Sequence, residues 1–198
     1  INVKQALIYT VLLCSIAFFI LIQFNQLTII LGLGSMFLAF TYPFMKRMTY
    51  WPQLFLGITF NWGIVMAWTA INNNISHEII VLYISAIFWT LGYDTIYGTQ
   101  DMSDDEIIGL KSTSIKFKKN IKSFVTFCYL VASSLILLLF KSEIGLNFFS
   151  VFVFLFILSL SYQLFKFNKY KPYTCLKMFK FNNYSGVFLF LSIILIDI

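Results

Sequence analysis

The chain has 198 residues, of which 60% are hydrophobic and only 11% are charged. Soluble domains usually carry about 25% charged residues, because their surfaces face water. Disordered chains combine low hydrophobicity with high charge, so this class is excluded as well. The composition therefore predicts an integral membrane protein, and its net charge of +6 has to be explained in that setting.

Seven apolar runs are candidates to cross a bilayer core of about 30 Å, which needs about 20 residues per helix. They cover residues 6–24, 27–45, 53–71, 79–97, 121–140, 147–165 and 184–197. We expect an all-α, polytopic transmembrane helix bundle that forms a single domain over residues 1–198. The first residue is Ile1, and no signal peptide pattern follows it, so we expect the chain to be incomplete at its N-terminus.

The connections between the predicted spans differ in charge. With seven spans, connections 45–52, 98–122 and 166–183 share one side with Lys4, and this side holds all of the Lys and Arg residues except Lys141. Because cytoplasmic connections carry an excess of Lys and Arg, we expect this side in the cytoplasm or the matrix, with the protein in a bacterial or organellar inner membrane. This topology accounts for the net charge, so we expect no nucleic-acid partner.

Five of the eight acidic residues lie near the end of the fourth predicted span, and they are Asp94, Asp101, Asp104, Asp105 and Glu106. A helix that continued through this region would place Asp94, Tyr97, Asp101 and Asp105 on one stripe, since each residue advances by about 100°. Clustered carboxylates at a membrane edge need a compensating cation. Mg²⁺ prefers such oxygen ligands and is often shared with substrate phosphates. The cluster predicts a Mg²⁺ site, with a solvated acidic loop as the alternative.

Basic and polar side chains complete this predicted site. Lys111 follows the acids closely, and Lys46 with Arg47 lies in the preceding connection of the same side. Next to a metal ion, such cations would neutralise a diphosphate and its leaving group. The alternative for Lys46 and Arg47 is a topology signal alone. Gln53 and Asn61 are rare polar residues within a predicted span, and they either bond to other helices or line the path of an aromatic substrate.

Several stretches resemble the UbiA superfamily of intramembrane prenyltransferases. The run Gly92–Asp105, followed by Ile108–Thr113, is similar to the second aspartate-rich motif of that family. The stretches that resemble its 4-hydroxybenzoate polyprenyltransferase branch in particular are Tyr42–Gly57, Phe60–Gly63 and Phe181–Gly186.

The resemblance implies a nine-span helical fold that binds Mg²⁺, polyprenyl diphosphate and 4-hydroxybenzoate. It implies transfer of the polyprenyl group to the ring of 4-hydroxybenzoate in ubiquinone synthesis. The metal ligands are then expected to be Asp101 and Asp105, with support from Asp104. The expected catalytic residues are Asp94, Tyr97, Arg47 and Lys111. The resemblance and the basic and polar residues described above together give four expected substrate-binding residues, which are Lys46, Arg47, Asn61 and Lys111.

The sequence departs from the family pattern in one respect. The family's first aspartate motif has the form Asn-Asp-x-x-Asp, and nothing like it occurs here. We therefore expect the chain to lack the first two of nine spans and half of the metal site. Three alternatives stay open: a prenyltransferase for another aromatic acceptor such as a naphthoate or a homogentisate-like phenol, a cation-coupled membrane transporter, and an inactive fragment.

Overall fold

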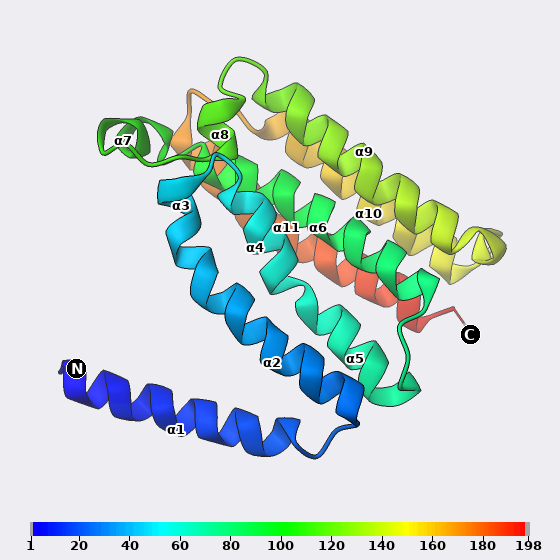
Figure 1. Ribbon diagram of the computed structural model, residues 1–198. Coiled ribbons are helices and arrows are strands. Elements are labelled where there is room, and N and C mark those ends of the chain that lie inside the picture. Colours follow the sequence, from blue (N-terminus) through cyan, green and yellow to red (C-terminus); the bar gives the residue numbers. More distant parts are fainter. Residues whose placement is uncertain (1, 197–198) are drawn as a thin grey trace.

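The computed structural model describes residues 2–196, which form a helical bundle without a strand (Figure 1). Its longer helices are α1 (Val3–Leu21), α2 (Gln26–Thr41), α4 (Pro52–Phe60), α5 (Trp62–Asn72), α6 (His77–Gly98), α9 (Ile121–Leu139), α10 (Phe148–Lys166) and α11 (Pro172–Ile194). Short helices in the connections are η1 (Tyr42–Phe44), α3 (Met45–Met48), α7 (Met102–Ile107), α8 (Thr113–Lys116) and η2 (Lys141–Glu143).

Six segments within the described residues are long and apolar enough to cross a membrane, which confirms the predicted fold class. They match the first six predicted spans in order. The seventh predicted span, 184–197, corresponds to the C-terminal half of α11, except that residue 197 lies outside the described residues. α11 begins earlier than predicted, at Pro172, because proline is favoured in the first turn of a helix. Its first half carries Lys177 and Lys180 and is too polar to count as a span.

The third predicted span is divided into α4 and α5 at Asn61. The Asn61 Nδ2 group donates to Gly57 O at 2.8 Å, a carbonyl of the preceding helix. The same nitrogen donates to Ala86 O at 3.3 Å and to Thr90 Oγ1 at 2.8 Å, both on α6. The side chain at the helix break therefore also ties α4 to α6, which confirms that Asn61 forms interhelical hydrogen bonds.

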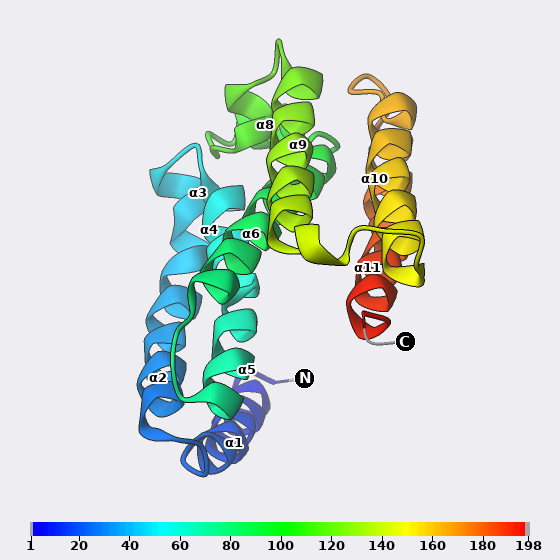
Figure 2. The same cartoon turned by 90° about the vertical axis from the view of Figure 1, so that its right-hand side faces the viewer.

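α6 lies at the centre of the bundle. It packs against α4 and α5 on one side and against α9 and α11 on the other (Figures 1 and 2). Gly92 permits the close approach of α9, since a Cβ atom at this position would lie 2.5 Å from the Tyr129 ring. The buried Tyr129 hydroxyl in turn donates to Gln163 Oε1 on α10 at 2.6 Å. Helices α6, α9 and α10 are thus joined by packing and by a buried hydrogen bond.

α1 is set apart from the other helices. Its packing is chiefly against α2, and none of its residues is buried. Figures 1 and 2 show α1 angled away from the rest of the bundle. A helix that is apolar on all sides and little covered by protein is suited to contact with lipid.

The three long basic connections meet at one end of the bundle, where α3, α7 and α8 lie together (Figure 1). A backbone hydrogen bond joins the first two connections, since Lys111 N donates to Lys46 O at 2.8 Å. The third connection is attached through Lys169 Nζ, which donates to Lys118 O at 3.1 Å. Segments that are far apart in the sequence thus form a single structured end.

Candidate active site

The predicted stripe of acids on one continuous helix is wrong, because α6 ends at Gly98 and α7 begins at Met102. The buried segment Ser112–Ser114 packs against the end of α6, and a Cβ atom at Gly98 would lie 2.8 Å from Ser114 Oγ. The chain therefore turns away at this point. The new helix α7 has Asp104 and Asp105 in its first turn, where negative charge complements the helix dipole.

The acids of α7 face different surroundings. Asp105 is buried, and its Oδ2 atom lies 3.7 Å from Lys46 Nζ. Asp101, at the N-cap of α7, and Asp104 are exposed. Within residues 2–196, no group of three or more His, Cys, Asp or Glu side chains is arranged to hold a metal ion. Because Mg²⁺ takes about six oxygen ligands, substrate or water would have to supply most of them at these acids.

Asp94 and Tyr97 lie on the last turns of α6. Asp94 is half-buried. Lys46 forms its ion pair with Asp105 of α7. The ring of Tyr97 packs against Phe179 of α11, with the ring centroids 4.6 Å apart. The structure thus brings the end of α6 into contact with α11.

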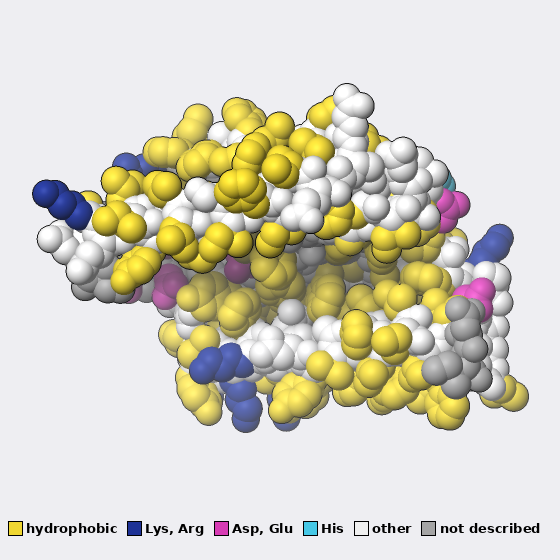
Figure 3. Space-filling view, turned by 90° about the horizontal axis from the view of Figure 1, so that it is seen from below, with side chains coloured by type: hydrophobic (Ala, Val, Ile, Leu, Met, Phe, Trp, Pro, Cys, Tyr) yellow, Lys and Arg dark blue, Asp and Glu magenta, His cyan; other side chains and the backbone are white. Residues whose placement is uncertain are grey.

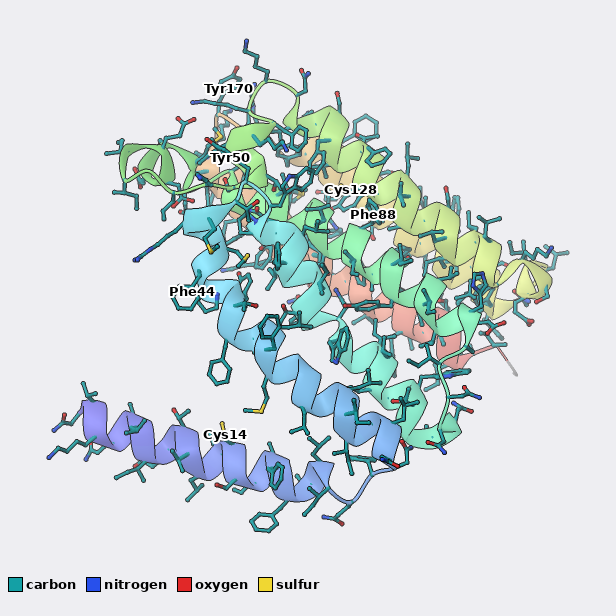
Figure 4. All side chains as sticks on the ribbon, in the orientation of Figure 1. Cys14, Phe44, Tyr50, Phe88, Cys128 and Tyr170 are labelled. Carbon is teal, nitrogen blue, oxygen red and sulfur yellow. The ribbon has the colours of Figure 1, made fainter. Side chains whose placement is uncertain are left out.

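Lys111 is placed beside α3 and not beside the acids. Its Nζ atom donates to Met48 O at 3.3 Å and lies 5.6 Å from the centroid of the Tyr50 ring. Figure 4 shows Tyr50 at this end of the bundle, near α8. Arg47 is exposed in the last turn of α3, and no ion pair or side-chain hydrogen bond is formed by it within the described residues. Of the three basic side chains, only Lys46 therefore pairs with an acid, while Arg47 and Lys111 lie on or beside α3.

A buried polar cluster holds the segment after Lys111 in place. Gln53 Oε1 on α4 accepts from Thr113 N at 2.9 Å, and Thr113 Oγ1 lies 2.7 Å from Thr95 Oγ1 on α6. Ser114 Oγ donates to Thr95 O at 2.8 Å. Gln53 was identified in the sequence as a polar residue within a span, whereas Thr95 and Thr113 were not. No local pattern marks them, because their role depends on contact between α4, α6 and α8.

A cavity of about 410 Å³ lies between the α4–α5 break, α6 and α11, and four of its lining residues are aromatic. Its lining consists of Phe60, Asn61, Trp89, Thr90, Tyr93, Asn182, Asn183, Gly186, Val187 and Phe190. Viewed from below, Figure 3 shows a hollow between the part of the molecule with α1 and the part with α11, with acidic side chains toward its left-hand end. Asn61 was expected here, whereas Asn182 and Asn183 were not named as site residues, although they belong to a stretch that resembles the family.

The family model of the UbiA prenyltransferase family matches residues 1–193. The chain belongs to the UbiA prenyltransferase family. It is 38% identical over 187 residues to the mitochondrial 4-hydroxybenzoate polyprenyltransferase of Homo sapiens, a match that covers 91% of this chain and 49% of the human protein. It is 38% identical over 192 residues to the 4-hydroxybenzoate octaprenyltransferase of Saccharophagus degradans, covering 96% of this chain and 64% of that protein. This UbiA family chain therefore spans about half the length of its human relative.

Two solved structures share the UbiA fold. A UbiA homolog from Aeropyrum pernix K1 superposes with a TM-score of 0.81 at 21% identity, over 98% of this chain and 73% of that chain. A structure of digeranylgeranylglyceryl phosphate synthase gives a TM-score of 0.73 at 16% identity, over 99% of this chain and 71% of that chain. The expected UbiA-type arrangement of membrane helices is thereby confirmed.

Proposed function

We propose that this protein transfers a polyprenyl group from polyprenyl diphosphate to the ring of 4-hydroxybenzoate, the aromatic prenylation step of ubiquinone synthesis. The observation that carries this proposal is the similarity to proteins named as 4-hydroxybenzoate prenyltransferases over 91% to 98% of the chain. Family membership also favours an enzyme over the alternative of a cation-coupled transporter.

The basic edge of the site supports binding of the diphosphate group. Lys46, Arg47 and Lys111 are held together by the backbone hydrogen bond between their two connections. In our proposal, Arg47 and Lys111 bind the diphosphate oxygens or the carboxylate of the acceptor. Lys46 bridges the diphosphate to the acids. Cations placed in this way stabilise the charge that develops on a departing diphosphate.

The carboxylates at the start of α7 are chemically suited to Mg²⁺, although they form an incomplete set of ligands. We propose that Asp101 and Asp105 hold the ion, with support from Asp104, and that diphosphate oxygens and water complete its coordination. A bound Mg²⁺ ion would neutralise charge on the leaving diphosphate. Asp105 suits this role because its buried side chain has a fixed position beside Lys46.

The aromatic cavity is suited to the reacting groups. Its rings exclude water that would otherwise capture the allylic cation. Phe60, Trp89 and Tyr93 line this space, and aromatic faces attract cations. The ring carbon ortho to the acceptor hydroxyl forms the new C–C bond to the allylic carbon, while the C–O bond to diphosphate breaks. The ring then loses its proton at that carbon, and Asp94 is the nearby base in this proposal.

The membrane setting follows from the six apolar segments. We propose that the end with α3, α7 and α8 faces the cytoplasm or the matrix, because nearly all of the basic residues lie there. We also propose that residues 1–198 act as part of one transmembrane prenyltransferase domain.

The proposal is tested in membranes that contain the expressed protein, supplied with polyprenyl diphosphate and labelled 4-hydroxybenzoate. We expect Mg²⁺-dependent formation of the prenylated acid and its loss on chelation. Asp101→Asn should abolish this transfer without changing membrane insertion, because it removes a proposed metal ligand. Unchanged turnover of Asp101→Asn would exclude the metal role, and preferred use of a naphthoate or a homogentisate-like phenol would replace the proposed acceptor.

A further inference from the structure

Three amide side chains line a cavity whose other side chains are mostly aromatic or aliphatic. Asn61 lies at the break between α4 and α5, and Asn182 and Asn183 lie on α11. Amides that face an apolar chain would be left without hydrogen-bond partners, at a cost of about 1–3 kcal/mol for each buried group. This lining therefore suits a ligand that offers polar atoms as well as an apolar ring.

A hydrogen-bond network fixes the orientation of Asn182. Its Oδ1 atom accepts from Trp89 Nε1 at 2.9 Å and from Gln163 Nε2 at 3.5 Å. Gln163 is held by Tyr129 through its Oε1 atom and by Ser185, to whose Oγ atom Gln163 Nε2 donates at 3.0 Å. Since the oxygen of Asn182 is committed to this network, its Nδ2 group is the atom left to donate.

Asn61 is oriented in the opposite sense. Its Nδ2 atom is committed to Gly57 O, Ala86 O and Thr90 Oγ1, so its Oδ1 atom is left to accept. Neither Asn182 Nδ2 nor Asn61 Oδ1 has a hydrogen-bond partner among residues 2–196, and neither is enclosed by protein. Asn182 thus offers the cavity a donor from α11, and Asn61 offers it an acceptor from the α4–α5 break.

We infer that Asn61 and Asn182 form a subsite that binds the phenolic hydroxyl of the aromatic acceptor. A phenolic hydroxyl both donates and accepts, so it matches one acceptor and one donor, whereas a carboxylate only accepts and would be repelled by Asn61 Oδ1. This inference rests on the proposed function for the identity of the acceptor. It assigns the hydroxyl to the aromatic cavity and leaves the carboxylate for the basic edge.

The test is equilibrium binding of labelled 4-hydroxybenzoate and of benzoate to the full chain in lipid nanodiscs, without any prenyl donor. Asn182→Asp keeps an oxygen for Trp89 and Gln163 but removes the free donor. We expect it to weaken 4-hydroxybenzoate binding about tenfold, the effect of losing one hydrogen bond in a buried site. Benzoate lacks the hydroxyl, so its affinity should stay within about twofold of the wild type. General repulsion by the new carboxyl group would weaken both ligands equally.

Two further variants test whether the ligands bind in this cavity. Gly186→Leu places a large side chain in the cavity, where an added Cβ atom would lie 3.6 Å from the Trp89 ring, and should weaken both ligands. Ser192→Ala is the matched control, because Ser192 is a buried polar residue of α11 that bonds only within its own helix and does not line the cavity. We expect its ligand affinities to match the wild type.

Each outcome decides between the two proposals. Three results would overturn the subsite. Asn182→Asp could affect both ligands equally, or it could affect neither. The wild type could also fail to bind 4-hydroxybenzoate. Unchanged binding in Gly186→Leu would overturn it as well. If the wild type binds 4-hydroxybenzoate through Asn182 but does not prenylate it, the subsite stands and the proposed function fails. If transfer occurs with an unchanged KM for 4-hydroxybenzoate in Asn182→Asp, the function stands and the subsite fails.

Discussion

At the scale of single residues, two neighbouring acids of α7 have different surroundings. Asp105 is buried beside Lys46, whereas Glu106 is exposed and pairs with Lys118 at 2.6 Å. Exposed ion pairs contribute little, with typical values of about 0–1 kcal/mol. A buried acid beside a cation has fewer alternative positions and a stronger electrostatic effect on its neighbours. Of these two acids, Asp105 is therefore the one suited to the role proposed for it at the diphosphate.

We expect Asp105→Asn to lower the rate of prenyl transfer by on the order of a hundredfold, because it removes an electrostatic contact at the reacting group. Glu106→Gln is the matched control, since it makes the same chemical change one residue away and breaks only an exposed pair. Its rate should stay within about twofold of the wild type. The measurement is transfer to labelled 4-hydroxybenzoate at equal protein content, and similar rates for the two variants would contradict the assignment of Asp105.

At the scale of helices, the approach of α6 to α9 depends on Gly92. The Tyr129 ring occupies the position where a side chain at 92 would begin, and its hydroxyl is fixed by the hydrogen bond to Gln163. This ring cannot move aside without losing that bond. The packing of these two helices therefore links the centre of the bundle to the network that orients Asn182.

Gly92→Ala should lower the free energy of unfolding by about 1–3 kcal/mol, the usual cost of inserting a methyl group into a packed core. Gly34→Ala is the control, because Gly34 also lies within a helix and has no atom within 4 Å of the added Cβ position. It should be neutral or stabilising by up to about 1 kcal/mol, since alanine restricts the unfolded chain. Denaturant unfolding in detergent micelles measures both variants, and equal stability would show that α9 yields to the added methyl group.

At the scale of the whole molecule, the bundle has two chemically different ends. The end with α3, α7 and α8 gathers the basic connections and the acids, while the opposite end has Lys141 and short connections (Figure 1). This separation supports a fixed orientation in the membrane.

A pair of single-cysteine variants tests the orientation in cells, in a background where Cys14, Cys128 and Cys175 are replaced by alanine. Ser103 in α7 and Ser142 in η2 are both exposed and lie at opposite ends of the bundle. With the acids on the cytoplasmic side, an impermeant maleimide should label Ser142→Cys in intact cells. It should label Ser103→Cys only after permeabilisation. The reverse pattern would invert the proposed orientation.

The sequence by itself determined the spans, the separation of charge and the family. These features depend on local properties, because the length of an apolar run and the excess of Lys and Arg in a connection need no knowledge of contacts. It also indicated Asp105, Lys46 and Asn61 as site residues. The assumption of a continuous helix from Asp94 to Asp105 failed, since the end of α6 is set by a segment that arrives later in the chain.

Only the tertiary structure decided which of these residues meet. Lys46 faces Asp105 because the connection after α2 is bonded through its backbone to the one after α7. The orientation of Asn182 is set by Trp89 of α6 and Gln163 of α10, which no spacing in the sequence links to it. Such contacts join elements that are distant along the chain, so they follow from the packing of the whole bundle and not from any local pattern.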